Sequence, residues 1–542
     1  MRTYFTIFLF ICFLIAGYSQ QASFDWAIQC NNPPNTTDTK TVLATGEDNS
    51  FYIAGEFVDT AVFDKDSLVS AGGTDVFLVK NNSQGSPEWT VLIGAEDYDY
   101  VQAIRAIPEV GVCMAGYFYG TTRIGTDTYS SFGSQDIFIA CFDQQGNFTW
   151  SRRAGGLSAD YVSSMDIDQD DNIVVAGYFY GDLDFGDTIL HASAGLDTYI
   201  AKFSSAGELL WAMAAGGSSS DQLRSVSIDP EGNIFFTGSF YYDFTIADTT
   251  ISTANPVGGF VAELDPEGNL IRIMQIEGTY LTPDIFVETD NGGNFYLAGN
   301  FSEDIWLGDS NFVAGPFNQD IFTAKCSADG QFVWASHATG RSSDQLMGIG
   351  TDIYNNLYLT GHFLDTISFG QLMIPYKLCC GSREIFLVNY DFNGKVQWGK
   401  QITGPRANVQ SMCIDETGDI RLSGLFTDTL AFDAIDLSSI SAYRTYITNV
   451  DAEMFTRIPQ QKANERYLLI TPNPASNMIS VDLSSTEALV YRIYNSSGNL
   501  VRSAKWGDNR RIDVSDLSPG LYVVQLSTIS GGISGSGKFI KF

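Results

Sequence analysis

Four aspartates recur at a fixed place in this chain and could supply carboxylate chemistry. Each of them lies ten residues after a tryptophan: Asp99, Asp160, Asp221 and Asp344. If their side chains faced one channel, they could form the acid and base pair that glycoside cleavage needs. The equivalent positions elsewhere hold Thr36, Thr282 and Asn408, and Asp, Asn and Thr side chains all accept hydrogen bonds from turn amides. We therefore expect structural clamps at these positions, with a ring of channel carboxylates as the alternative.

A second set of residues could bind a ligand through aromatic or polar side chains. A Gly-x-Phe tripeptide recurs along the chain, and its middle residue is Glu56, Tyr117, Tyr178, Ser239, Asn300, His362 or Leu425. Such variation is typical of a surface outside the core, and aromatic residues are common binding anchors. We predict a ligand site that draws on Tyr117, Tyr178, Asn300 and His362. Loose packing at the end of a strand explains the variation equally well.

The sequence offers few residues for histidine-dependent or metal-dependent catalysis. The chain has three histidines, His191, His337 and His362, and none belongs to a metal-ligand or catalytic motif. The acids of Asp166–Asp171 alternate as in a calcium loop, but the same place in other units reads as a hairpin turn. We predict no catalytic residue, no metal site and no cofactor. The enzymatic alternative is an extracellular polysaccharide hydrolase or lyase that uses carboxylates at a channel mouth.

The charge of the chain excludes one large class of partner. The chain has 63 acidic and 30 basic residues and a formal net charge of -33. This negative potential repels phosphate backbones and anionic lipid headgroups. Nucleic acid is therefore not an expected partner, and the charge is typical of a soluble secreted surface.

All these residues belong to a unit of about 61 residues that recurs seven times. Each unit has short β-branched and aromatic runs, separated by turns such as Asp229–Asn233 and Asp265–Asn269, which suit hairpin closure. Two hairpins give four antiparallel strands, and a four-stranded sheet that is repeated radially is a propeller blade. We predict an all-β fold with a seven-bladed β-propeller over residues 24–455.

The repeats resemble those of seven-bladed propellers in secreted and surface proteins of some Gram-negative bacteria. The resemblance rests on two segments, Gly232–Phe240 and Asp75–Lys80. The fifth unit departs from the pattern, because Arg272 replaces its tryptophan and Gly258 replaces its aspartate. We expect that blade to be irregular.

The N-terminus has the pattern of a signal peptide over residues 1–19. Arg2 precedes an apolar run from Tyr4 to Ala16, and small residues follow. The run is shorter than the ~20 apolar residues of a bilayer span. We expect no transmembrane segment after signal cleavage.

Seven cysteines remain after the leader, and neither their number nor their spacing suggests a zinc site or a disulfide framework. Four of them fall in or beside repeat strands and are expected to be free, buried apolar residues: Cys113, Cys141, Cys326 and Cys413. The adjacent Cys379 and Cys380 could form a vicinal disulfide or remain two thiols.

A polar linker over residues 456–466 separates the repeats from a tail of short strands over residues 467–542, which we predict to be a small immunoglobulin-like β-sandwich. The tail resembles the type A C-terminal sorting domain of the type IX secretion system. The residues that carry this resemblance as a sorting signal are Pro472, Asn473, Pro474, Gly498, Gly520, Tyr522, Lys538 and Lys541. The resemblance implies that the type IX secretion machinery handles the chain, usually removes the tail, and leaves the protein secreted or attached to the outer cell surface.

The function predicted from these features is that of an exported binding or scaffold module. Its expected ligand is an extracellular glycan or protein. Since propellers host both binding and catalysis, the fold class does not decide between this function and the enzymatic alternative.

Overall fold

The computed structural model divides the chain into two compact units, Met1–Ala452 and Glu453–Phe542. It describes residues 22–30, 39–315, 318–377 and 382–451 of the first unit, and residues 466–467, 469–471, 475, 477–482, 489–495, 500–505, 511–518, 520–528 and 533–541 of the second. Several predicted features lie outside the described residues. They are the signal peptide, the linker apart from Arg466, the two adjacent cysteines Cys379 and Cys380, and four residues of the sorting signal, Pro472, Asn473, Pro474 and Gly498.

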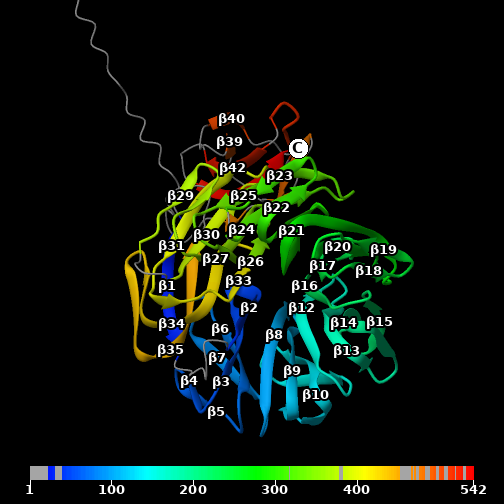
Figure 1. Ribbon diagram of the computed structural model, residues 1–542. Coiled ribbons are helices and arrows are strands. Elements are labelled where there is room, and N and C mark those ends of the chain that lie inside the picture. Colours follow the sequence, from blue (N-terminus) through cyan, green and yellow to red (C-terminus); the bar gives the residue numbers. More distant parts are fainter. Residues whose placement is uncertain are drawn as a thin grey trace, which may run out of the picture. The chain divides into compact units, whose positions relative to one another are not determined.

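The first unit consists of antiparallel strands that follow one another along the chain (Figure 1). Its strands are short and rich in β-branched and aromatic residues, which suits a pleated sheet with buried faces. Four sheets each have four strands. They contain β2 (Thr41–Thr45), β3 (Phe51–Phe57), β6 (Asp75–Asn81) and β7 (Pro87–Ile93); β8 (Tyr98–Ile107), β9 (Gly111–Ile124), β10 (Asp127–Asp143) and β11 (Phe148–Ala154); β12 (Asp160–Ile167), β13 (Ile173–Asp184), β14 (Ile189–Phe203) and β15 (Leu209–Ala215); and β26 (Gln345–Thr351), β27 (Leu357–Phe363), β30 (Glu384–Tyr390) and β31 (Val396–Ile402).

The fourth and fifth repeats share one ten-stranded sheet, because β21 pairs with a strand of each repeat, and a short hairpin of the sixth repeat joins this sheet through β25. This sheet contains β16 (Asp221–Ile228), β17 (Ile234–Phe240), β20 (Gly258–Leu264), β21 (Leu270–Thr289), β22 (Phe295–Leu307), β23 (Ser310–Val313), β24 (Asp320–Cys326), β25 (Phe332–Thr339), β28 (Ile367–Phe369) and β29 (Leu372–Ile374). Short hairpins form from β4 (Thr60–Phe63) with β5 (Asp66–Val69) and from β18 (Asp243–Ile246) with β19 (Thr249–Ser252), and η1 (Glu47–Asn49) is a single 3-10 turn.

The last sheet contains strands from both ends of the unit. It is formed by β1 (Ser23–Cys30), β32 (Arg406–Ala407), β33 (Ser411–Ile414), β34 (Ile420–Phe432) and β35 (Ile435–Asp451). Figure 1 shows β1 in blue beside the yellow to orange β34 and β35, and Trp26 pairs with Asn449. The Thr41 backbone N–H and hydroxyl both donate to Gln410 Oε1 at 3.0 Å. The first and last repeats are therefore in direct contact.

The first strands of successive repeats lie next to one another, in the order β2, β8, β12, β16, β21, β26 and β33, and β33 contacts β2 again. Such a circuit of antiparallel sheets is propeller-like, because neighbouring blades pack through their faces and the circuit leaves few open sheet edges. The prediction of an all-β, propeller-like fold is confirmed. The count of seven blades stays a prediction.

Four of the recurring tryptophans donate their indole N–H to a carbonyl oxygen of the next repeat: Trp89, Trp150, Trp211 and Trp334. The Trp150 indole Nε1 donates to the Ser205 carbonyl oxygen at 2.9 Å, and the ring covers the turn that contains Gly207. A Cβ on Gly207 would lie 2.6 Å from this ring, and the residue has a φ of +79°. Both observations require glycine there. In the fifth unit, Arg272 replaces the tryptophan and donates to the Ala328 carbonyl oxygen instead.

The expectation that Cys113 and Cys141 are free is wrong. They form a disulfide between β9 and β10, where they are paired across the ladder with their Cα atoms 4.1 Å apart. The hairpin contains the long β10, so the register that brings the two residues opposite each other is not evident from their spacing of 28 residues. Cys326 is free and buried, and Cys413 is free and partly buried.

The second unit has two sheets. One contains β36 (Arg466–Tyr467), β39 (Leu489–Asn495), β40 (Leu500–Lys505), β42 (Gly520–Thr528) and β43 (Ile533–Lys541), and the other contains β37 (Leu469–Thr471), β38 (Met478–Asp482) and β41 (Arg511–Asp513). Tyr522 stacks on Phe539 in the core, and Gly520 pairs with Lys541 in the ladder between β42 and β43. Lys538 pairs with Val523 in the same ladder. The immunoglobulin-like assignment of this sandwich stays a prediction.

Candidate ligand-binding site

Four tyrosine side chains form a continuous cluster across two neighbouring sheets. Tyr100 on β8 lies 5.0 Å from Tyr117 on β9, Tyr117 lies 5.2 Å from Tyr161 on β12, and Tyr161 lies 5.0 Å from Tyr178 on β13, measured between ring centroids. All four residues are partly exposed. We refer to them as the tyrosine cluster. Partly exposed phenol rings offer both an apolar face and a hydroxyl, a combination typical of binding surfaces.

Charged side chains lie on both sides of the tyrosine cluster. Beside Tyr117, the Lys40 backbone N–H donates to Glu56 Oε2 at 3.0 Å, and Lys40 Nζ donates to Gln102 Oε1 at 2.7 Å. Burial raises the pKa of Glu56 to about 8 and lowers the pKa of Lys40 to about 7. Beside Tyr178, Arg224 forms an ion pair with Asp284 at 3.0 Å. The cluster therefore combines aromatic faces with polar groups at its two edges.

Asn300 and His362 do not join the tyrosine cluster. Both are buried, and each accepts a backbone N–H of the next repeat: Asn300 Oδ1 from Leu346 at 2.9 Å, and His362 Nε2 from Val409 at 2.9 Å. Burial lowers the pKa of His362 to about 3, so its imidazole is neutral. At these two positions, the side chain after the glycine connects neighbouring sheets.

The four aspartates that follow the tryptophans are fully buried. The backbone N–H groups of Gly156 and Gly217 donate to Asp160 at 2.8 Å and to Asp221 at 2.7 Å, as expected of turn clamps. Each aspartate lies near an acid of the preceding repeat, in the pairs Asp75 with Asp99, Asp136 with Asp160, Asp197 with Asp221, and Asp320 with Asp344.

Burial is the main cause of the pKa shifts of these aspartates, and the neighbouring carboxylate adds to it. Their pKa values rise to about 7 for Asp99 and Asp221 and to about 8 for Asp160 and Asp344. No group of three or more His, Cys, Asp or Glu side chains within the described ranges is arranged to hold a metal ion.

A cavity of about 230 Å³ lies among the first strands of six repeats. Its charged residues are Arg105, Asp166 and Glu288. Arg105 Nε donates to Asp166 Oδ1 at 3.0 Å, and the Ile228 N–H donates to Asp166 Oδ2 at 2.8 Å. Burial and the nearby Asp166 raise the pKa of Glu288 to about 8. We refer to this space as the axial cavity.

Sequence reasoning found half of the tyrosine cluster and missed Tyr100 and Tyr161. A signal for them does exist, because each follows one of the repeated aspartates and the two are 61 residues apart. The equivalent positions in other repeats hold Gln222 and Gln345. Only the pairing of these residues with the variable Gly-x-Phe positions in the ladders shows that they form one surface.

Two curated relatives match the chain. WD repeat-containing protein L264 of Acanthamoeba polyphaga mimivirus is 22% identical over 497 residues, which cover 71% of this chain and 35% of the relative. Regulatory protein FlaEY of Caulobacter vibrioides is 20% identical over 543 residues, which cover 89% of this chain and 56% of the relative. The chain thus spans about a third to a half of the length of these relatives.

Several solved structures are similar to the chain. The extracellular domain of the one component system BT4673 from B. thetaiotaomicron is 10% identical, with 95% of this chain and 99% of that chain covered and a TM-score of 0.17. PorZ of Porphyromonas gingivalis, a surface component of the type-IX secretion system, is 9% identical, with coverage of 95% and 100% and a TM-score of 0.16. Sqt1 from Chaetomium thermophilum is 11% identical, with coverage of 78% and 99% and a TM-score of 0.35.

The C-terminal unit has a family match. Residues 469–541 match the model of the secretion system C-terminal sorting domain. None of the described residues belongs to a helix long and apolar enough to span a membrane. The chain is thus an exported protein that carries a type IX secretion system C-terminal sorting domain behind a propeller-like unit, and it is secreted or attached to the outer cell surface.

Proposed function

We propose that the propeller-like unit is a binding module for an extracellular glycan or protein, and that the tyrosine cluster is its ligand site. The observation that carries this proposal is the chain of ring contacts from Tyr100 to Tyr178 on partly exposed side chains. Aromatic anchors supply most of the binding energy at many interfaces. A face of four rings is large enough to contact more than one sugar ring or side chain.

The polar groups at the edges of the tyrosine cluster could fix the orientation of a ligand that stacks on the rings. Lys40 with Glu56 at one edge and the Arg224–Asp284 ion pair at the other place polar groups beside the rings, and the phenol hydroxyls donate and accept hydrogen bonds. A few placed polar groups around an apolar surface are typical of small-ligand and glycan sites. The proposed ligand is therefore polar and able to stack on rings.

The test is a glycan and peptide array probed with the purified full chain. The variant Tyr117→Ala/Tyr178→Ala is probed beside it, with Tyr242→Ala as the control, because Tyr242 is 64% exposed and belongs to another repeat. The expected result is saturable binding to one ligand class that the double variant loses and the control keeps. Absence of array binding, or binding that the double variant retains, overturns the proposal.

The axial cavity favours a second candidate function, an extracellular polysaccharide hydrolase or lyase. Glu288, with its pKa raised to about 8, would be protonated at neutral pH, as a general acid must be. Asp166, held by Arg105, would be the second carboxyl group of the pair. Turnover of a polysaccharide by the wild-type chain that is lost in Glu288→Gln would favour the enzyme. Array binding without turnover would favour the binding module.

A further inference from the structure

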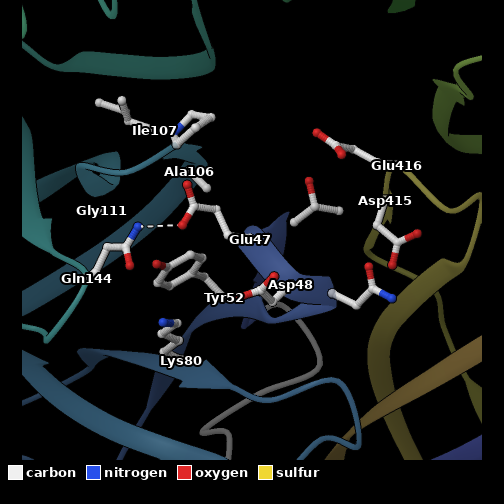
Figure 2. Close-up of a pocket in the computed structure, with 14 residues that line it drawn as sticks. Glu47, Asp48, Tyr52, Lys80, Ala106, Ile107, Gly111, Gln144, Asp415 and Glu416 are labelled. Carbon is white, nitrogen blue, oxygen red and sulfur yellow. Dashed lines mark hydrogen bonds between the residues drawn. The ribbon is translucent and has the colours of Figure 1, made fainter. Parts of the chain in front are cut away.

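A second cavity, of about 450 Å³, lies beside the turn between β2 and β3 (Figure 2). It is at the opposite end of these strands from Lys40 and Glu56, so it is separate from the tyrosine cluster. Its lining includes Gly46, Glu47, Tyr52, Lys80, Gln144 and Glu416. The equivalent part of other repeats contains a buried aspartate that forms an ion pair with a lysine.

The fifth repeat contains the complete arrangement. Asp290 lies at the start of the turn before β22, and its Oδ2 accepts a hydrogen bond from Lys325 Nζ at 2.8 Å. Lys325 Nζ also donates to the Tyr296 hydroxyl at 2.8 Å, and the side chains of Lys325 and Asp290 are 8% and 0% exposed. A buried lysine thus meets a carboxylate and a phenol. The third repeat repeats the ion pair between Lys202 and Asp168 at 2.8 Å.

The first repeat has the same lysine and tyrosine without the aspartate. Tyr52 pairs with Lys80 across the ladder in the same way that Tyr296 pairs with Lys325. The same outer hydrogen bond closes both turns, because the Gly46 N–H donates to the Ser50 carbonyl oxygen at 2.8 Å and the Asp290 N–H donates to the Asn294 carbonyl oxygen at 2.8 Å, although the inner bond differs. Gly46 therefore occupies the position of Asp290, and a glycine supplies no carboxylate.

Two described carboxylates of the first repeat interact with Lys80, Glu88 and Glu47, and neither stands at the aspartate position of the turn. Lys80 Nζ reaches Glu88 at 3.4 Å, but Glu88 is on the surface with its side chain 43% exposed. Glu47 accepts hydrogen bonds from Gln144 Nε2 at 2.9 Å and from the Glu109 N–H at 2.6 Å. Tyr52 is 2% exposed, and its hydroxyl makes no hydrogen bond to any described residue.

In the second repeat, all three residues of the arrangement, the aspartate, the tyrosine and the lysine, are replaced. Ile107 stands at the aspartate position, and Cys113 and Cys141 stand at the tyrosine and lysine positions, where they form the disulfide. The three positions have changed together there. In the first repeat only the aspartate has changed, and an open cavity lies beside the two groups that remain.

We propose that this cavity binds the carboxylate of a zwitterionic ligand, an α-amino acid or a short peptide. In the first repeat, the ligand carboxylate takes the place that the Asp290 side chain has in the fifth repeat. It accepts hydrogen bonds from Lys80 Nζ and the Tyr52 hydroxyl. A charge-assisted bond of this kind, away from bulk water, is stronger than one on an open surface. The site does not depend on the tyrosine cluster.

The opposite wall of the cavity sets the second requirement for the ligand. In Figure 2, Tyr52 and Lys80 lie on one side and Asp415 and Glu416 on the other. Asp415 is engaged by Arg421 at 2.9 Å, whereas Glu416 on the same wall is exposed, as is Asp48 beside Tyr52. Their negative charge repels a simple anion and attracts an ammonium group. A ligand with both charges is complementary to both walls.

The experiment is calorimetric titration of the full chain with single L-amino acids and with the dipeptide Gly-Gly. We expect saturable binding of at least one of these ligands, and its affinity should fall by at least tenfold when the ligand carboxylate is amidated or its amino group acetylated. Lys80→Met should weaken binding by at least tenfold. Lys65→Met, at an exposed lysine of the same repeat that does not line the cavity, serves as the control and should leave binding unchanged.

A double variant tests the repeat comparison directly. Gly46→Asp/Ser50→Asn copies the ends of the fifth-repeat turn and supplies the missing carboxylate within the chain. It should abolish ligand binding while the thermal midpoint stays equal to that of the wild type or rises, which separates occupation of the site from misfolding. The proposal is overturned if no amino acid or dipeptide binds saturably, or if binding survives both Lys80→Met and the double variant.

Discussion

The ring of Tyr117 meets the ring of Tyr161 edge-on, with centroids 5.2 Å apart and planes inclined at 79°. This contact joins two tyrosine pairs that belong to different sheets. Edge-to-face contacts between aromatic rings stabilise by about 0.5–1.5 kcal/mol beyond the area they bury. The tyrosine cluster is therefore a surface whose shape depends on how two neighbouring sheets are packed.

Tyr161 has an inner position in the tyrosine cluster, whereas Tyr100 is at one end of it. Tyr161 touches both Tyr117 and Tyr178, whereas Tyr100 contacts only Tyr117 within the cluster. We expect Tyr161→Ala to weaken ligand binding by about 2 kcal/mol or more and Tyr100→Ala by about 1 kcal/mol or less. Titration of both variants with the ligand found on the array measures the difference. Equal losses would mean that the rings act separately.

The buried aspartate pairs predict that stability falls as the pH rises. The pKa of Asp160 is raised from 3.8 to about 8, and that of Asp344 is raised equally, so between these values the folded chain holds protons that the unfolded chain releases. Their stabilising contribution is fully present below about pH 4 and is lost as the pH rises through the folded-state pKa values. Chemical denaturation at pH 5, 7 and 9 should show this decline.

The variant Asp160→Asn isolates one pair from the others. The seventh repeat already has an amide at this position, Asn408, whose Oδ1 accepts the Leu425 N–H at 2.7 Å. An amide cannot ionise, so this variant should be more stable than the wild type at pH 9, by on the order of 1–2 kcal/mol, and nearly equal to it at pH 5. A pH dependence identical to that of the wild type would show that Asp160 does not carry the effect.

The tryptophans should stabilise the contacts between repeats more than the core of any one repeat. In Trp150→Phe, the Ser205 carbonyl oxygen loses the indole donor, while an aromatic ring still covers Gly207. We expect a loss of about 1 kcal/mol in the free energy of unfolding from the hydrogen bond, and about 3 kcal/mol or more for Trp150→Ala, which also leaves a cavity. Urea denaturation of the three chains gives these numbers. A loss in Trp150→Phe as large as that in Trp150→Ala would assign the whole effect to the hydrogen bond.

The disulfide predicts a redox-dependent stability. It connects residues 28 positions apart in one hairpin, and cross-links of this length stabilise by about 3 kcal/mol through the unfolded chain. Cys113→Ala/Cys141→Ala should lower the free energy of unfolding by about this amount. A reducing agent should lower the stability of the wild type and leave that of the double variant unchanged, as urea denaturation with and without dithiothreitol would show.

The sequence predicted the features that repeat. The spacing of Gly, Phe, Asp and Trp recurs because each repeat solves the same packing problem, so the all-β class and the pairing within repeats could be inferred from local pattern. The sorting domain could be recognised because its short motifs occur in order at the end of the chain. Local pattern and composition were sufficient for these conclusions.

The features that depend on contacts between repeats could not be predicted in the same way. Tyr117 and His362 occupy the same position of the unit, yet one lies in a partly exposed cluster and the other accepts a backbone N–H of the next sheet. Whether a side chain is exposed there depends on the neighbouring strand, which the position in the unit does not reveal. The disulfide was missed for a related reason, since it depends on the register of a long hairpin.

The pairing of β1 with β35 has a consequence for the order of folding. The Thr448 hydroxyl donates to the Trp26 carbonyl oxygen at 2.8 Å, across 422 positions of the chain. Contacts between such distant segments form late and slowly, because a very long loop must close first. Residues up to Asp451 must therefore be available before the last sheet is complete, and a chain cut before β35 would leave both β1 and β34 without their shared neighbour. Any processing that detaches the sorting domain without opening the circuit of sheets has to act beyond Asp451.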